Sequence, residues 1–116
     1  MKLEEIIYQD DFVFAVCKFL DEFKRSENKY EMISSEPKGD IDNTNRCVLA
    51  AISHKLANDF MIDIPAWVNK AEYFLSVPVY SFNTKNKDYQ EFLKNNTPYE
   101  FASRNIFYGS NVIERV

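Results

Sequence analysis

DNTNRCVLAAISHKLANDFMIDIPAW, residues 42–67, carries the longest uninterrupted helical pattern in the chain. Its apolar residues recur at spacings of three and four, which places them on one face of a helix. They are Val48, Leu49, Ile52, Leu56, Ala57 and Phe60. Asp42 or Asn43 can cap the first turn, because a side-chain oxygen there accepts a bond from a free amide. We expect this helix to be the centre of the core.

Pro65 ends this helix, because proline lacks an amide hydrogen and clashes with the preceding turn. Proline also favours the first position of a new helix. The sequence after it, AWVNKAEYF, predicts a short helix to about Tyr73 with Trp67 facing inward. We expect the residues around this boundary to pack in the core: Phe60, Ile62, Ile64 and Trp67.

On the N-terminal side, residues 12–25 repeat the amphipathic pattern, with Asp10 or Asp11 as the cap. The predicted buried face comprises Phe12, Val16, Phe19, Leu20 and Phe23, with Val13 at its edge. A shorter helix is predicted over residues 28–34. The segment Pro37-Lys38-Gly39 then predicts a loop before the central helix.

On the C-terminal side, residues 74–82 alternate in hydrophobicity as a strand would, but Pro78 in their middle disfavours pairing within a sheet. We expect an extended connector here. A helix capped by Asp88 follows, with Tyr89, Phe92 and Leu93 on one face.

Thr97-Pro98-Tyr99-Glu100 then predicts another helix start, since Thr97 can cap it and Glu100 can close a capping box. This helix should end near Asn105. The tail IFYGSNVIERV predicts two short strands around Gly109-Ser110-Asn111, a small hairpin.

Composition agrees with a mainly α fold: a small helical domain with a short C-terminal β-hairpin. The 116 residues fit a single globular domain, 1–116. Apolar residues make up 46% of the chain and aromatic residues 16%, which supplies a large core. Only two glycines and four prolines are present, which favours helices over a turn-rich β-sandwich.

The net charge of about −4, without a Lys/Arg stripe, argues against direct nucleic-acid binding and for a basic partner protein. Cys17 and Cys47 lack metal-ligand spacing, and each lies in an apolar run, so we expect buried thiols and a reducing compartment. Glu4 and Glu5 stand where a signal peptide would have its apolar segment, so we expect no signal peptide. The longest apolar run is too short to span a membrane. A cytoplasmic protein is therefore expected.

Candidate chemical groups are sparse, and we expect no catalytic residue, metal or cofactor. His54, the single histidine, has no second ligand at metal-binding spacing and fits a partly exposed helix position. Cys17 precedes Lys18, which could activate a thiol, but its apolar neighbours favour core packing. A solvated face and a helix cap explain the acidic cluster of Glu4, Glu5, Asp10 and Asp11.

Two features are candidates for binding. Arg104-Asn105 ends a predicted helix, where a cation complements the helix dipole or, alternatively, anchors a partner's carboxylate. The second half of the chain also holds more aromatic residues than a core needs, a mild sign of an interaction surface. These are Tyr73, Phe74, Tyr80, Phe82, Tyr89, Tyr99 and Tyr108.

Residues 30–116 carry a series of short motifs in a fixed order. They are Glu36-Pro37, Leu49-Ala50-Ala51, Leu56-Ala57, Pro65-Ala66-Trp67, Leu75-Ser76-Val77-Pro78, Pro98-Tyr99-Glu100-Phe101, Arg104-Asn105-Ile106-Phe107 and Ile113-Glu114-Arg115-Val116. In this the chain resembles a bacterial domain of unknown function. That domain is often found C-terminal to a phage-repressor-type helix-turn-helix, in toxin–antitoxin-like or mobile-element contexts. No helix-turn-helix is recognisable here, so the resemblance does not imply DNA binding.

The favoured hypothesis is a non-catalytic protein–protein interaction module, antitoxin-like or accessory to a regulator, with a basic, toxin-like partner. Its interaction or motif residues would be Trp67, Tyr80, Arg104, Asn105 and Phe107. A second hypothesis is a small enzyme or small-ligand-binding domain with a pocket near Trp67 and Tyr80. A third is a structural homodimer whose aromatic tail pairs with itself.

Overall fold

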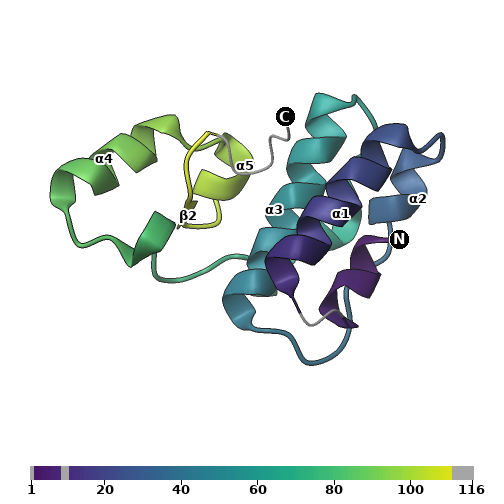
Figure 1. Cartoon of the computed structure of the whole chain (residues 1–116), viewed down its shortest axis with the longest axis horizontal. Coiled ribbons are helices and arrows are strands. Elements are labelled where there is room, and N and C mark those ends of the chain that lie inside the picture. The colour runs from purple at the N-terminus through teal and green to yellow at the C-terminus, as the bar shows by residue number, and fades with distance from the viewer. Residues whose placement is uncertain (1, 9–10, 111–116) are drawn as a thin grey trace.

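The computed structural model describes residues 2–8 and 11–110, and its other elements are arranged around helix α3, Asn43–Asp59 (Figure 1). The α-helices are α1 Phe12–Arg25, α2 Lys29–Ile33, α4 Lys87–Asn96 and α5 Tyr99–Ala102. The 3-10 helices are η1 Leu3–Tyr8, η2 Ala66–Asn69, η3 Ala71–Tyr73 and η4 Ser81–Asn83. The strands are β1 Val79–Tyr80 and β2 Ile106–Phe107. The predicted mainly α fold is confirmed.

Helix α3 is buried on almost every side. Residues 47–53 are all buried, and Leu56 and Ala57 follow them. Successive residues turn by about 100° around a helix, so seven consecutive buried residues cover its whole circumference. The prediction that only one face of this helix is buried was therefore wrong, because its other faces are buried as well. The predicted cap is confirmed, because Asp42 Oδ2 accepts a hydrogen bond of 3.1 Å from the Asn45 amide.

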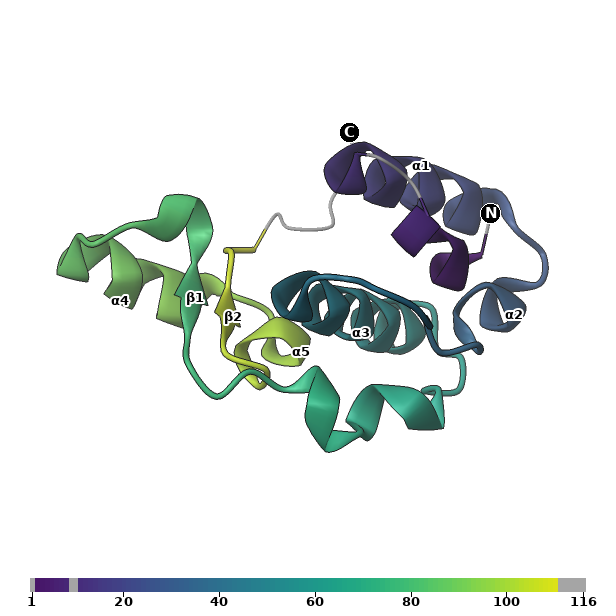
Figure 2. The same ribbon diagram turned by 90° about the horizontal axis from the view of Figure 1, so that it is seen from below.

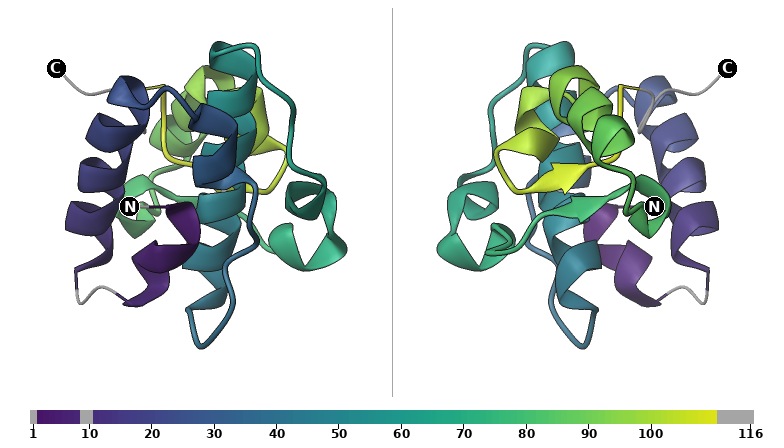
Figure 3. Two further views of the ribbon diagram at one scale, coloured as in Figure 1. Left: turned by 90° about the vertical axis from the view of Figure 1, so that its right-hand side faces the viewer. Right: turned by 90° about the vertical axis from the view of Figure 1, so that its left-hand side faces the viewer.

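Three groups of elements cover α3. Helix α1, with η1 and α2, lies on one flank and the η2–η3 run lies on the opposite flank, as Figures 2 and 3 show. Helix α5 packs along α3 between the two. The predicted bounds of α1 are confirmed, and Asp11 Oδ1 caps it with a bond of 3.0 Å from the Phe14 amide. Phe19, Leu20 and Phe23 are its buried face.

The chain restarts at Pro65 as predicted, although the new turns are 3-10 rather than α. Trp67 is buried, and its indole Nε1 donates a hydrogen bond of 2.9 Å to the Ile33 carbonyl. Its ring meets Tyr73 edge to face at 5.1 Å. The packing prediction fails for Ile64, which is exposed where the chain leaves the end of α3, and Phe60 is also partly exposed.

The two strands correct the predicted connector and hairpin. Val79–Tyr80 forms a strand directly after Pro78, and it pairs in parallel with Ile106–Phe107, Val79 opposite Ile106. Pro78 lies before the first residue of the strand, so its missing amide hydrogen removes no hydrogen bond between the two strands. The first strand of the predicted hairpin is therefore real but takes a different partner. The second predicted strand lies outside the described residues.

Two predicted helix caps were wrong. Asn86, not Asp88, caps α4, because its Oδ1 accepts a bond of 2.9 Å from the Tyr89 amide. Thr97 closes α4 instead of opening α5: its Oγ1 donates to the Leu93 carbonyl at 2.6 Å and accepts from the Gly109 amide at 3.0 Å.

The predicted capping box also fails at its other end. The Glu100 carboxylate accepts a bond of 2.8 Å from Asn58 Nδ2 on α3 rather than returning to Thr97. A contact between helices has thus replaced the local one. Helix α5 ends at Ala102, earlier than predicted. In the described part of the chain, no helix combines the length and apolar character that a membrane span requires.

Truncation of the α3 core tests its central place in the fold. Leu49 is wholly buried, so Leu49→Ala should lower the free energy of unfolding by about 2–5 kcal/mol through lost burial and a residual cavity. Val13→Ala removes an exposed side chain and should change it by less than about 0.5 kcal/mol. Urea unfolding followed by circular dichroism measures both, and equal losses would contradict this architecture.

Candidate functional site

Arg104 follows the end of α5, and its side chain is 0% exposed. Its NH1 donates to the Glu100 carbonyl at 2.7 Å, and its NH2 donates to the Val68 carbonyl at 2.8 Å. NH1 also lies 3.2 Å from Nδ1 of His54 on α3. Because a guanidinium has only donors, Nδ1 must be the acceptor, and the neutral imidazole carries its proton on Nε2. Arg104 thus joins α5, η2 and α3.

The positive charge of Arg104 has an aromatic ring and backbone carbonyls around it rather than a carboxylate. The ring of Phe74 lies 4.6 Å from its Cζ, and burial lowers the pKa of the guanidinium. Nε has no hydrogen-bond partner among the described residues. Since the group is enclosed, it does not reach a partner's carboxylate in this structure, and its contacts are those of a structural tie.

Asn105 completes this tie. Its backbone has a φ of +64°, a left-handed conformation that asparagine tolerates better than most residues. Its Nδ2 donates to the Leu75 carbonyl at 2.7 Å, and its own carbonyl accepts from the Val79 amide at 2.9 Å. The Leu75 amide in turn donates to the Arg104 carbonyl at 3.2 Å. The Arg104-Asn105 pair therefore holds β1 beside β2.

Tyr80 and Phe107, also predicted as interaction residues, are neighbours across the two strands. Their rings stack at 5.5 Å with an interplanar angle of 23°. Both are half-buried, so each covers part of the other.

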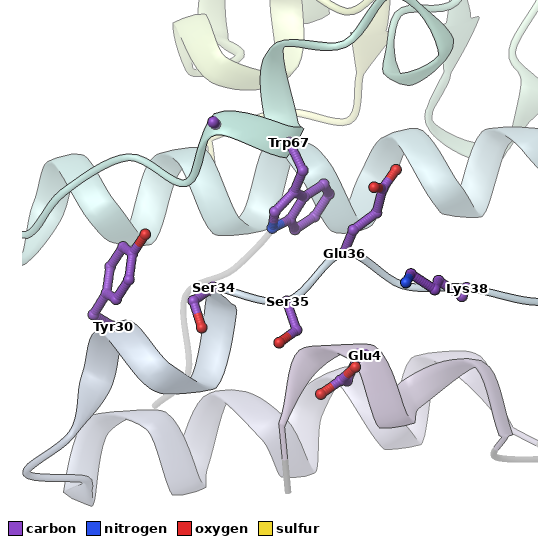
Figure 4. Close-up of a pocket in the computed structure, with 8 residues that line it drawn as sticks. Glu4, Tyr30, Ser34, Ser35, Glu36, Lys38 and Trp67 are labelled. Carbon is purple, nitrogen blue, oxygen red and sulfur yellow. The ribbon is translucent and has the colours of Figure 1, made fainter.

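A hollow of about 480 Å³ lies beside Trp67, as one alternative hypothesis expected. Figure 4 shows Tyr30, Glu4 and Trp67 around the loop that carries Ser34 and Ser35. Glu36, Lys38 and Ala66 complete the lining, and Tyr80 is not part of it. The hollow is open to solvent rather than enclosed.

One of the two acidic groups that line this hollow, Glu36, is already engaged. Glu36 accepts a hydrogen bond of 2.6 Å from the Tyr73 hydroxyl and one of 2.7 Å from Lys70 Nζ. The bonds from Lys70 and Tyr73 hold the pKa of Glu36 below its ordinary value, while burial and Glu36 raise the pKa of Tyr73. Glu36 is thus kept ionised by a structural network, which suits it poorly to acid–base catalysis.

The two cysteines differ in their surroundings. Cys47 is buried as predicted, and burial raises the pKa of its thiol. Cys17 is only partly buried, which corrects the prediction of core packing. Cys17 lines a surface groove on α1 together with Val13 and Phe14, two exposed side chains from the first turn of the helix. The other lining residues are Asp11, Lys18 and Asp21.

The remaining polar candidates lie in different parts of the structure. His54 lies half-buried on α3, as its helix position predicted. Of the predicted acidic cluster, Glu4 lines the Trp67 hollow, Asp11 caps α1, Glu5 is exposed, and Asp10 lies outside the described residues. Across residues 2–8 and 11–110, no group of three or more His, Cys, Asp or Glu side chains is arranged to hold a metal ion.

Three aromatic side chains, Phe82, Tyr89 and Phe92, stand out from η4 and α4, and we call them the aromatic face. They are 92%, 38% and 56% exposed. Tyr89 and Phe92 stack at 6.1 Å with an interplanar angle of 11°. Helix α4 lies apart from α1, α2 and α3 (Figure 1), and only Leu93 of this helix is buried. The helical pattern had grouped Phe92 with Leu93, and its exposure was not foreseen.

Other aromatic residues of the predicted surplus have different environments. Tyr73 is buried, Tyr80 and Tyr108 are half-buried, and Tyr99 is exposed.

The chain matches no family model, no curated protein and no solved structure.

The Glu36 network predicts a specific dependence of stability on acid. Because its pKa is lowered on folding, Glu36 stabilises the fold fully above its unfolded value of 4.5, and this contribution disappears as pH falls through the lower folded value. Glu36→Gln should therefore lose less stability than the wild type over this range. Tyr73→Phe, which removes one donor, should give an intermediate slope. Urea unfolding between about pH 3 and pH 6 measures this, and identical slopes would contradict it.

Proposed function

We propose that this chain is a non-catalytic protein–protein interaction module and that the aromatic face is its contact surface. The observation that carries the proposal is the 92% exposure of Phe82 on η4 together with the exposed Tyr89–Phe92 stack on α4. Aromatic residues are enriched in the centres of protein interfaces, where a few of them provide most of the binding energy.

The backbone under Phe82 supports this assignment. Phe82 and Asn83 have φ values of +57° and +50°, and this left-handed conformation costs about 1–2 kcal/mol at Phe82, whereas asparagine tolerates it better. Strain of this kind is characteristic of functional positions. The Phe82 side chain is almost fully exposed, so it contributes little hydrophobic stabilisation to the folded chain. Its burial against a partner would contribute about 1.5–3 kcal/mol of binding free energy.

The charges around the aromatic face resemble the rim of an interface. Lys85, Lys87, Asp88, Glu91 and Lys94 are all exposed, so an apolar centre is bordered by both signs of charge. The chain as a whole carries −4, which attracts a basic protein over long range. We therefore assign a basic protein as the partner.

The wider role follows from the same proposal. An antitoxin-like or regulator-accessory protein that binds a basic, toxin-like partner in the cytoplasm agrees with an acidic chain whose two cysteines are free thiols. The hollow beside Trp67 supports a ligand-binding role less well, because Glu36 is engaged by Lys70 and Tyr73. Self-association through the aromatic face is an outcome of the test below.

Phe82→Ser and Phe92→Ser should each weaken partner binding at least about tenfold, because they remove apolar anchors at the contact. Met61→Ser is a matched control: Met61 is 91% exposed, also has a positive φ, and lies at the end of α3 rather than on η4 or α4. The tagged wild type, captured at native expression, identifies the stoichiometric protein. Calorimetry with that purified protein then gives the Kd of each variant.

Equal Kd values for all three variants, a stoichiometric partner that is acidic, or the absence of any stoichiometric protein would contradict the proposal. Light scattering over a dilution series separates the remaining case. A dimer that Phe82→Ser dissociates and Met61→Ser preserves would make a second copy the partner. Circular dichroism confirms that each variant is folded.

A further inference from the structure

The contact between His54 and Arg104 requires one protonation state. Arg104 NH1 lies 3.2 Å from His54 Nδ1, and a guanidinium has no acceptor. A proton on Nδ1 would therefore convert a hydrogen bond into a contact between two donors that both carry positive charge. The imidazole is half-buried, so solvent protons reach it, whereas the guanidinium is wholly enclosed.

We propose that His54 and Arg104 form a proton-sensitive latch between α3 and α5. When His54 is neutral it accepts from Arg104 and holds the end of α5 against α3. When His54 takes up a proton, repulsion loosens Arg104 and the segment that Arg104 fixes.

The surroundings of the latch determine the direction of this response. The titratable and charged groups that face it are Glu100 and Tyr99 from α5 and Cys47 from α3, and Lys55 of α3 acts on Glu100. The η2–η3 run contributes the Val68 carbonyl, and the ring of Phe74 follows it. Burial and then the Arg104 charge lower the pKa of His54, and the smaller effect of Glu100 raises it.

Glu100 does not neutralise the latch by direct pairing. Its carboxylate accepts from Asn58 Nδ2 at 2.8 Å, and the group that Arg104 contacts is the Glu100 backbone carbonyl. The other acceptors that Arg104 contacts, the Val68 and Glu100 carbonyls, already take bonds from NH2 and NH1, and Nε has no partner among the described residues. The loosened elements would be α5 and the Val68 turn.

The stability consequence has a definite sign. A histidine that is neutral in the fold binds its proton more readily in the unfolded chain, where its ordinary pKa is 6.5. Stability therefore falls as pH drops below that value, by at most about tenfold in the unfolding constant per pH unit for one proton. The loss ends once pH has passed the lower folded value.

The chain contains a single histidine, so its NMR signals test the latch without a mutation. At about pH 7.5 the wild type should show the Nε2–H tautomer, and the ring should titrate below the ordinary value. An Nδ1–H tautomer, or titration at or above the ordinary value, overturns the proposal.

His54→Asn places a neutral amide oxygen near the Nδ1 position and should flatten the fall in stability between about pH 7.5 and pH 5.5. Arg104→Met, where it folds, should raise the pKa of His54 toward its ordinary value. An unchanged slope in His54→Asn overturns the latch, whether or not the Arg104 variant folds.

Hydrogen exchange locates the change. When the pH is lowered from about 7.5 to about 5.5, the wild type should lose exchange protection at the amides of residues 101–105 more than at those in the centre of α3. The comparison is made after correction for intrinsic exchange rates. His54→Asn should not show this difference. Uniform loss of protection, or none, overturns the assignment to α5. None of these measurements needs the partner protein, so their outcome is independent of the proposed function.

Discussion

The all-round burial of α3 is the constraint on which the other elements depend. A helix that is buried over its whole circumference cannot be stable at a surface and must be covered from several directions. Small side chains at Ala50, Ala51 and Ala57 let the covering segments approach closely. Those segments include η2, η3 and α5, which are far too short to persist alone. They exist as ordered turns because α3 supplies a surface for them.

Arg104 solves the problem of fixing such short segments. A buried cation is expensive to desolvate, and here the Glu100 and Val68 carbonyls with the Phe74 ring offset the cost in place of a counter-ion. Each of those contacts belongs to a different stretch of chain, so their relative positions are set together. Trp67 and Arg104 therefore have evident structural roles, since both donate hydrogen bonds to backbone carbonyls of distant segments.

The sequence predicted best those features that depend on neighbouring residues. The cap at Asp11, the periodicity of α1 and the restart after Pro65 are local, and all were confirmed. Features that depend on distant contacts were missed. Thr97 has the composition of a helix start, yet its hydroxyl bonds Leu93 and Gly109. The parallel pairing of β1 with β2 joins segments 27 residues apart, and no local pattern encodes it.

The same distinction applies to the candidate site. The excess of aromatic residues was visible in composition, but composition cannot say which rings are covered. Tyr73 donates a hydrogen bond to Glu36 and is buried. Phe82 is exposed and has a left-handed backbone conformation, which no sequence pattern predicted. Glu36, His54, Arg104 and Asn105 each make polar contacts within the described chain. The large aromatic side chains Phe82 and Phe92 are more than half exposed, and contiguous exposed apolar patches mark interaction sites in many proteins.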